Sequence, residues 1–87
     1  MLKIQRTASS DVVFTVSGRL EAHNVYELSA LLAAEEGGRT RVLDLKDLVL
    51  VDSDAVRFLR TCEADSIVLR NCPSYIRAWM ARDGEQP

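Results

Sequence analysis

The chain has 87 residues and a mass of 9.7 kDa, which is enough for one domain and too little for two. Hydrophobic residues make up 47% of the sequence and charged residues 28%, as in an ordinary globular protein. Eleven basic and 13 acidic residues leave a formal net charge of −2, which does not attract nucleic acid or an anionic membrane. We therefore expect a single domain over residues 1–87, with no nucleic-acid partner.

The sequence has neither the pattern of a signal peptide nor that of a transmembrane span. Its purely apolar runs are only a few residues long, and its N-terminus has no apolar core segment, so we expect a cytoplasmic protein without membrane insertion. Cys62 and Cys72 have no second cysteine pair and no nearby histidine, which fits neither a zinc site nor a disulfide framework. We expect reduced thiols in or near the core, and no metal or other cofactor.

The first part of the chain predicts a hairpin followed by an amphipathic helix. Alternation over residues 2–6 and a run rich in Val, Phe and Thr over residues 12–17 predict two strands. We expect Gly18 to break the second strand, Asn24 to cap the helix, and the glycine pair 37–38 to end it. Helical spacing then places on one inward stripe the residues Val25, Leu28, Leu31 and Leu32.

Residues 42–65 predict a buried extended segment followed by a second helix. A short strand over residues 42–45 and a continuous apolar run over residues 48–51 flank a predicted bend at Lys46-Asp47. A helix is expected to begin at Asp52-Ser53-Asp54, because all three side chains suit a helix start. Its inward face is expected to consist of Ala55, Val56, Leu59 and Cys62.

The last part of the chain predicts another strand and another helix. Residues 66–70 have an apolar centre typical of a buried strand. Pro73 fits the first turn of a helix, and Gly84 is expected to end that helix. Its apolar face is expected to pack into the core through Tyr75, Ile76, Trp79 and Met80.

This order of elements predicts an α/β fold with a small mixed sheet and crossover helices. Strands separated by single helices run parallel through right-handed crossovers, and the first strand pairs antiparallel with the second. Binding sites in such sheets lie beyond the carboxyl ends of the parallel strands. Two loops stand at that place, over residues 18–24 and residues 51–55, so we expect the function to reside there.

No catalytic pattern is present in the sequence. It contains no phosphate-binding glycine loop, no dinucleotide fingerprint, no nucleophile elbow and no zinc-protease motif. His23 is the only histidine, and a single histidine in a loop is more often solvated than catalytic. We expect a protein that is not an enzyme.

The run Asp52-Ser53-Asp54 has two interpretations. In the structural one, the three side chains satisfy free amides at a helix start, which is worth about 0.5–2 kcal/mol for the cap. In the functional one, Ser53 is an exposed hydroxyl whose phosphorylation adds about −1.5 to −2 charges at a helix N-terminus. The chemistry alone favours the structural interpretation.

The stretch from Val13 to Met80 resembles a STAS domain, the module of bacterial anti-sigma-factor antagonists and of the cytoplasmic tails of sulfate transporters. Residues 14–21 (FTVSGRLE) are similar to the family's strand that ends in Gly-x-Leu-Asp. Residues 42–48 (VLDLKDL) are similar to its hydrophobic-Asp-Leu strand and bend. Residues 51–56 (VDSDAV) fall where the family has Asp-Ser-Ser/Thr/Ala-Gly-Leu, and RNCPS over residues 70–74 precedes the third helix as in the family.

The resemblance implies a function in partner switching. In the family, the unphosphorylated antagonist binds an anti-sigma factor with serine-kinase activity and is released when that kinase phosphorylates an acceptor serine. By position, the acceptor falls on Ser53 and the aspartate before it on Asp52. Here Asp54 stands in place of a small neutral residue, Ala55 in place of glycine, and Glu21 in place of aspartate.

The resemblance leaves two functional hypotheses. The first is a regulatory module that binds an anti-sigma factor or another regulatory protein and is switched at Ser53. The second is a scaffold subunit of a transporter or sensory complex that is not phosphorylated. In both, the expected partner-binding residues are Gly18, Arg19, Glu21, His23, Asp52, Ser53, Asp54, Ala55 and Arg57.

Compared with the family, the fold is expected to be truncated after the third helix, where a further strand and helix usually follow. An open sheet edge invites pairing with another chain. We therefore expect a weak homodimer, or a partner that covers the edge.

Overall fold

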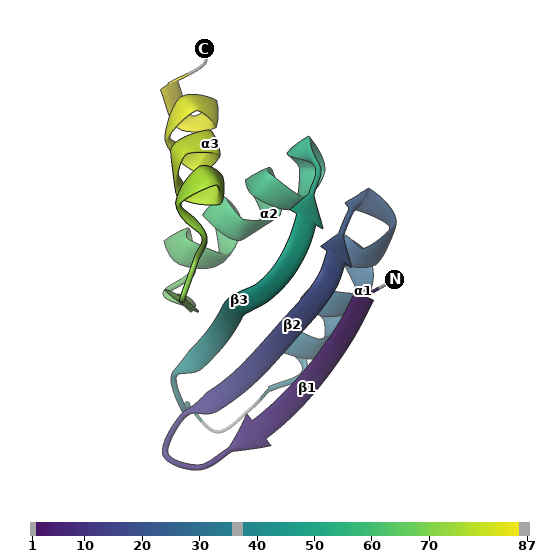
Figure 1. Ribbon diagram of the computed structural model, residues 1–87. Coiled ribbons are helices and arrows are strands. Elements are labelled where there is room, and N and C mark those ends of the chain that lie inside the picture. The colour runs from purple at the N-terminus through teal and green to yellow at the C-terminus, as the bar shows by residue number, and fades with distance from the viewer. Residues whose placement is uncertain (1, 36–37, 86–87) are drawn as a thin grey trace.

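The computed structural model describes residues 2–35 and 38–85, and within them the chain forms a four-stranded mixed sheet with helices packed against it (Figure 1). The elements are β1 (Leu2–Ala8), β2 (Val12–Leu20), α1 (Ala22–Ala33), β3 (Arg41–Val51), α2 (Ser53–Ala64), β4 (Val68–Arg70) and α3 (Ser74–Glu85). In the view of Figure 1, α1 and α2 lie behind the sheet, and α3 packs against α2.

The sheet has the predicted topology. The strand order is β1-β2-β3-β4, with β1 antiparallel to β2 and with β2, β3 and β4 parallel. Val42 pairs with Val68 and Leu43 with Leu69, so the two segments belong to one sheet, as expected. The predicted buried strand over residues 66–70 is shorter, because β4 begins at Val68, and its three residues are exposed or half-buried. The predicted small mixed α/β fold with crossover helices is therefore confirmed.

The core lies between the sheet and the helices. Strand β2 alternates, and its buried positions Val12, Phe14 and Val16 face the helices. The side chains that the fold buries most completely include Phe14, Leu28, Leu43, Leu59 and Ile76, from strands and helices alike. Trp79 packs against this core and Met80 lies in it, which confirms the prediction that they are core anchors. Both cysteines are free thiols, Cys62 buried and Cys72 half-buried, as predicted.

Two predicted interruptions of strands are wrong. Gly18 has a φ of +92° and lies beside a shift of register between β2 and β3, so the irregularity is accommodated within the sheet and the strand continues to Leu20. The segment Lys46-Asp47 is not a bend that separates two strands, because β3 runs unbroken from Arg41 to Val51. The irregularity is taken up by a second shift of register, next to which Asp44 Oδ1 accepts the Lys46 N–H at 3.2 Å.

Two predicted helix boundaries are also corrected. Helix α1 begins at Ala22 with Glu21 as its N-cap, while Asn24 lies three positions further and its Oδ1 accepts the Glu21 N–H at 3.2 Å. Helix α3 continues through Gly84 to Glu85, because one glycine lowers helix stability without ending a helix.

Two further predictions concern α1 and the segment after it. Leu31 lies outside the inward stripe, with 40% of its surface exposed. The predicted end of the helix at the glycine pair is wrong for Gly38, because α1 ends at Ala33 with Ala34 as its C-cap; Gly38 lies in the segment that follows, with a φ of +73°, and Gly37 lies outside the described residues.

At one edge of the sheet the last strand, β4, is only three residues long. Over the described part of the chain, β4 pairs with residues 42–44 of β3, and no strand pairs with that side of β3 beyond Asp44. Seven residues of β3, from Leu45 to Val51, therefore keep a side without a neighbouring strand. The homodimer or covering partner expected at an open edge stays a prediction.

Candidate functional site

The two predicted loops lie next to each other at one end of the sheet. Leu20, the last residue of β2, is in register with Val51, the last residue of β3. Each strand is followed after one residue by a helix, α1 at Ala22 and α2 at Ser53. The N-terminal turns of both helices are therefore neighbours, in the place that the parallel topology predicts (Figure 1).

Asp52 joins these two turns through its carboxylate. Its Oδ1 accepts the N–H of Ala55, in the first turn of α2, at 2.9 Å. Its Oδ2 accepts the N–H of Ala22, the first residue of α1, at 2.8 Å. The first N–H groups of a helix have no carbonyl partner within the helix. Asp52 therefore supplies the missing acceptor to two helices at once.

The same hydrogen bonds determine how Asp52 titrates. Partial burial of the carboxylate favours its neutral form and works to raise its pKa, but the N–H donors of Ala55 and Ala22 favour the ionised form more strongly. The pKa of Asp52 is consequently held below its ordinary value. At neutral pH, Asp52 is a carboxylate held in place by two helices.

Ser53 and Asp54 are exposed in the first turn of α2. Ser53 is the first residue of the helix, directly after the fixed Asp52. The Asp54 carboxylate accepts from Arg57 Nη1 at 3.1 Å, and both side chains are more than half exposed. A hydroxyl in this position is open to solvent and to a second protein, with a charged pair beside it.

The structure places the other predicted site residues around this point with differing exposure. Arg19 and His23 are exposed, while Glu21 and Gly18 are half-buried near the end of β2 and the start of α1. Ala55 is completely buried and belongs to the core. The expectation that the side chain of Ala55 contacts a partner is therefore corrected: its methyl group packs inward, and its N–H is used by Asp52.

The sequence predictions missed an exposed apolar patch near this end of the sheet, and they wrongly placed Tyr75, which belongs to it, on the core-facing side of the last helix. Val49 is 73% exposed, Leu50 45% and Tyr75 50%, and the Tyr75 hydroxyl donates to the Val49 carbonyl at 3.4 Å. The continuous apolar run over residues 48–51 indicated full burial. The register between Gly18↔Leu48 and Arg19↔Leu50 leaves Val49 as an extra residue in β3, and such a bulge turns side chains outward.

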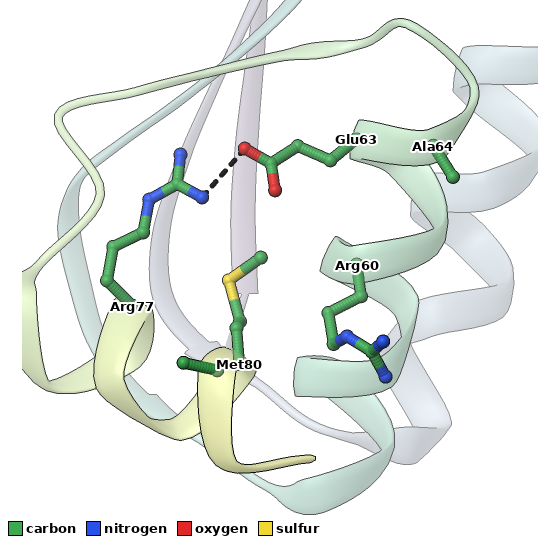
Figure 2. A pocket seen from close by; sticks show the side chains of 6 residues that line it. Arg60, Glu63, Ala64, Arg77 and Met80 are labelled. Carbon is green, nitrogen blue, oxygen red and sulfur yellow. Dashed lines mark hydrogen bonds and ion pairs between the residues drawn. The ribbon is translucent and has the colours of Figure 1, made fainter. Parts of the chain in front are cut away.

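A hollow of the surface lies elsewhere, between α2 and α3 (Figure 2). Its walls are Arg60, Glu63 and Ala64 from α2, and Arg77, Met80 and Ala81 from α3. Arg77 Nη1 donates to Glu63 at 2.7 Å across it, as Figure 2 shows. Arg60 donates in turn to Asp83 at 2.9 Å. This groove contains none of the predicted site residues, and the two ion pairs mark it as the seam where α3 is attached to α2.

Two absences apply to the part of the chain that the structure describes. Within residues 2–35 and 38–85, no group of three or more His, Cys, Asp or Glu side chains is arranged to hold a metal ion. None of the helices over the same residues combines the length and apolar character that a membrane crossing requires.

Comparison with known proteins gives matches at the level of three-dimensional structure. A structure described as a crystal structure analysis of Mglu matches with a TM-score of 0.57 and 22% sequence identity, over 82% of this chain and 19% of that chain. This chain thus spans about a fifth of the length of the Mglu chain. An uncharacterized protein of the DUF3478 family from Shewanella loihica PV-4 matches with a TM-score of 0.52 and 17% identity, over 95% of this chain and 76% of that one.

The protein from Shewanella loihica is described as having a SpoIIAA-like fold. No protein-family model and no curated protein matches the sequence. At 17% and 22% identity, the two structural matches establish the fold alone. This chain has a SpoIIAA-like, that is STAS-like, fold. The resemblance noted from the sequence motifs is confirmed for the fold.

Proposed function

We propose that this domain is a regulatory binding module of the cytoplasm that acts in partner switching and is controlled by phosphorylation of Ser53. The observation that carries the proposal is the position of Ser53: it is exposed, begins α2, and follows an aspartate held by two backbone N–H groups. A rigid, exposed hydroxyl at the carboxyl ends of parallel strands suits recognition by a kinase that is also the binding partner. The domain acts by binding and not by catalysis, and the partner is an anti-sigma factor with serine-kinase activity.

Electrostatics explain how a phosphate would switch binding. The positive end of the α2 dipole attracts a phosphate by roughly 0.3–1 kcal/mol. Asp52 and Asp54 repel it, and at about 6 Å and an effective dielectric of 20–80 each repulsion is worth about 0.7–3 kcal/mol per unit charge. The phosphate is therefore locally unfavourable. A partner that packs over the helix start is expelled by charge, with no need for the domain to refold.

The second candidate is a scaffold subunit of a transporter or sensory complex that is never phosphorylated. Asp54 favours it, because this exposed carboxylate beside Ser53 already places a permanent negative charge at the helix start. In this case the exposed residues Val49, Leu50 and Tyr75 would contribute to a constitutive contact. The two candidates differ in whether the charge on residue 53 alters affinity.

The test begins with co-purification from the native cell, followed by mass spectrometry of the partner and of Ser53. Titration calorimetry with that partner then compares variants. We expect Ser53→Asp to weaken binding by tenfold or more, Ser53→Ala to retain it, and Asp54→Ser to strengthen it.

Ser74→Asp is the matched control for these measurements. Ser74 is also the exposed first residue of a helix, α3, so this variant adds the same charge to an equivalent position elsewhere. Ser74 adjoins Tyr75 of the exposed patch, so a change in affinity is expected to be much smaller than that of Ser53→Asp. Equal affinities for all the Ser53 and Asp54 variants would refute switching at Ser53 and favour the second candidate function, the scaffold subunit.

A further inference from the structure

The carboxylate of Asp52 is a physical link between two segments that are 30 residues apart in the sequence. One oxygen is bound to the Ala55 N–H of α2, and the other to the Ala22 N–H of α1, at 2.9 and 2.8 Å. A single side chain thus fixes the first turns of both helices relative to each other. Any change that moves or repels this carboxylate acts on both turns.

We infer that Asp52 couples the two loops, so that a negative charge on Ser53 is transmitted to the first turn of α1. The inference rests on the proposed function, because it takes Ser53 as the place where charge is added. It goes beyond that proposal in assigning Asp52 as a positioning residue and in extending the switched surface to residues 21–23. The surface that a partner contacts then consists of both loops, and its conformation changes at both when Ser53 carries a negative charge.

The coupling follows from competition for the same N–H groups. A phosphate on the first residue of α2 is attracted to the free amides of that turn, one of which Asp52 already uses. The two anions also repel each other. Charge-assisted hydrogen bonds such as those of Asp52 are sensitive to a second anion nearby, because both the acceptor position and its charge determine their strength.

The consequence at α1 is specific. The Ala22 N–H belongs to the first turn, where no preceding carbonyl of the helix is available to accept it. When the Asp52 carboxylate moves away, the Ala22 N–H loses its acceptor and donates to water instead. The first turn of α1 is then less stable. Ala22 and His23 are both exposed, so the change takes place on the surface beside Ser53.

Amide hydrogen exchange on the isolated ¹⁵N-labelled domain, with phosphoserine incorporated at position 53, tests the coupling without a partner. We expect the Ala22 amide to exchange about tenfold faster or more, the change that corresponds to loss of one hydrogen bond to a charged acceptor. Ser74→Asp, which adds charge to the start of α3, should leave Ala22 unchanged. Unchanged exchange at Ala22 with phosphoserine at position 53 would overturn the inference.

A second variant shows whether Asp52 carries the effect. Asp52→Asn has one acceptor oxygen for two N–H donors, so it should already accelerate exchange at Ala22 or at Ala55. Phosphoserine at position 53 should then add less than it does beside Asp52. An equal addition in both backgrounds would mean that the charge bypasses Asp52, and the inference fails. If Asp52→Asn does not fold, the phosphoserine and Ser74→Asp proteins still decide the question.

The coupling and the proposed function fail in different ways. Ala22 exchange is measured on the domain alone, whereas switching is measured as affinity for the partner. Faster exchange of the Ala22 amide together with an unaltered affinity for the partner supports the coupling and refutes the proposed switch. An altered affinity for the partner together with an unchanged exchange rate at Ala22 supports the switch and refutes the coupling.

Discussion

Replacing Asp52 by alanine should destabilise the fold far more than replacing its neighbour Asp54. Asp52 accepts N–H groups from the starts of two helices, whereas Asp54 forms one exposed ion pair with Arg57 within α2. Both residues are aspartates and lie two positions apart, so a difference between them reports the geometry of the carboxylate and not its charge. Asp54→Ala is therefore the natural control.

The magnitude follows from the two hydrogen bonds. Loss of an N-cap side chain costs about 0.5–2 kcal/mol, and a hydrogen bond to a charged group contributes about 1.5–3 kcal/mol. Because Asp52 is half-exposed and water replaces part of what is lost, the lower halves of these ranges apply. We expect Asp52→Ala to lower the free energy of unfolding by about 2–3 kcal/mol, against about 0.5 kcal/mol or less for Asp54→Ala.

Urea denaturation at pH 7 measures both values. A domain of this size has a free energy of unfolding of roughly 4–13 kcal/mol, so a loss of 2–3 kcal/mol moves the midpoint by about 1–3 M. Asp52→Asn keeps one acceptor oxygen, so its urea midpoint should lie between those of the wild type and of Asp52→Ala. If Asp52→Ala and Asp54→Ala have the same midpoint, the link between the two helices makes no contribution and the reasoning is refuted.

The effect of Asp52 should also depend on pH in a defined direction. The folded protein holds the pKa of Asp52 below its ordinary value, because the N–H donors outweigh partial burial. The stabilisation is therefore fully present above the ordinary pKa of about 4 and is lost as the pH falls through the lower pKa of the folded state. The difference in stability between the wild type and Asp52→Asn should shrink below about pH 4 and stay constant from pH 5 to pH 8.

Two further predictions concern the core. Burial, helped by the nearby Asp65, raises the pKa of Cys62 to about 12, and the half-buried Cys72 has its pKa raised less far. Iodoacetamide at pH 8 should therefore modify Cys72 before Cys62, and mass spectrometry that finds Cys62 modified first would contradict the burial. Leu59 is completely enclosed on α2, so Leu59→Ala should lower the free energy of unfolding by about 2–5 kcal/mol and Leu59→Met by less than about 1.5 kcal/mol. Urea denaturation checks both values, and similar losses for the two variants would contradict tight packing at this position.

Much of the fold could be predicted because the apolar pattern of each element agrees with its place in the sheet. Strand β2 alternates at Val12, Phe14 and Val16, and all three are buried. In α2, the inward stripe of Ala55, Val56, Leu59 and Cys62 was predicted residue by residue. The parallel order then follows from the single helices between strands. These features depend on local spacing, which a sequence displays directly.

The errors arose where backbone irregularities replace regular pairing. Gly18 and the segment Lys46-Asp47 have the composition of chain breaks, yet each is accommodated in a continuous strand by a shift of register. Such a shift is a property of two paired strands, so neither strand alone predicts it. The exposure of Val49 has the same origin, because only the pairing with β2 shows that Val49 is an extra residue.

The position of the candidate site could be predicted from the sequence, but the hydrogen bond that links its two loops could not. Asp52 was expected to cap α2, and its bond to the Ala55 N–H is that cap. The bond to the Ala22 N–H depends on the register that brings Leu20 beside Val51, which no local pattern contains. The prediction that Asn24 caps α1 is wrong because Glu21 is the N-cap, and the acceptor of the Ala22 N–H lies in another loop.

The two carboxylates on either side of Ser53 therefore have different consequences for an added charge. Asp52 is already bound by two N–H groups, so its negative charge is partly balanced and its response to a phosphate is mainly a movement that affects α1. Asp54 is exposed and forms an ion pair with Arg57 of the same helix, so it repels a phosphate without a hydrogen bond to α1 that it could release. At about 6 Å in a dielectric close to that of water, this repulsion is worth about 0.7 kcal/mol per unit charge. In the proposed switch, Asp54 would therefore determine the electrostatic cost of phosphorylating Ser53, and Asp52 would determine whether the first turn of α1 responds to it. Asp54→Ser should alter phosphorylation and affinity without changing exchange at Ala22, whereas Asp52→Asn should accelerate exchange at Ala22 or at Ala55 in the unmodified domain.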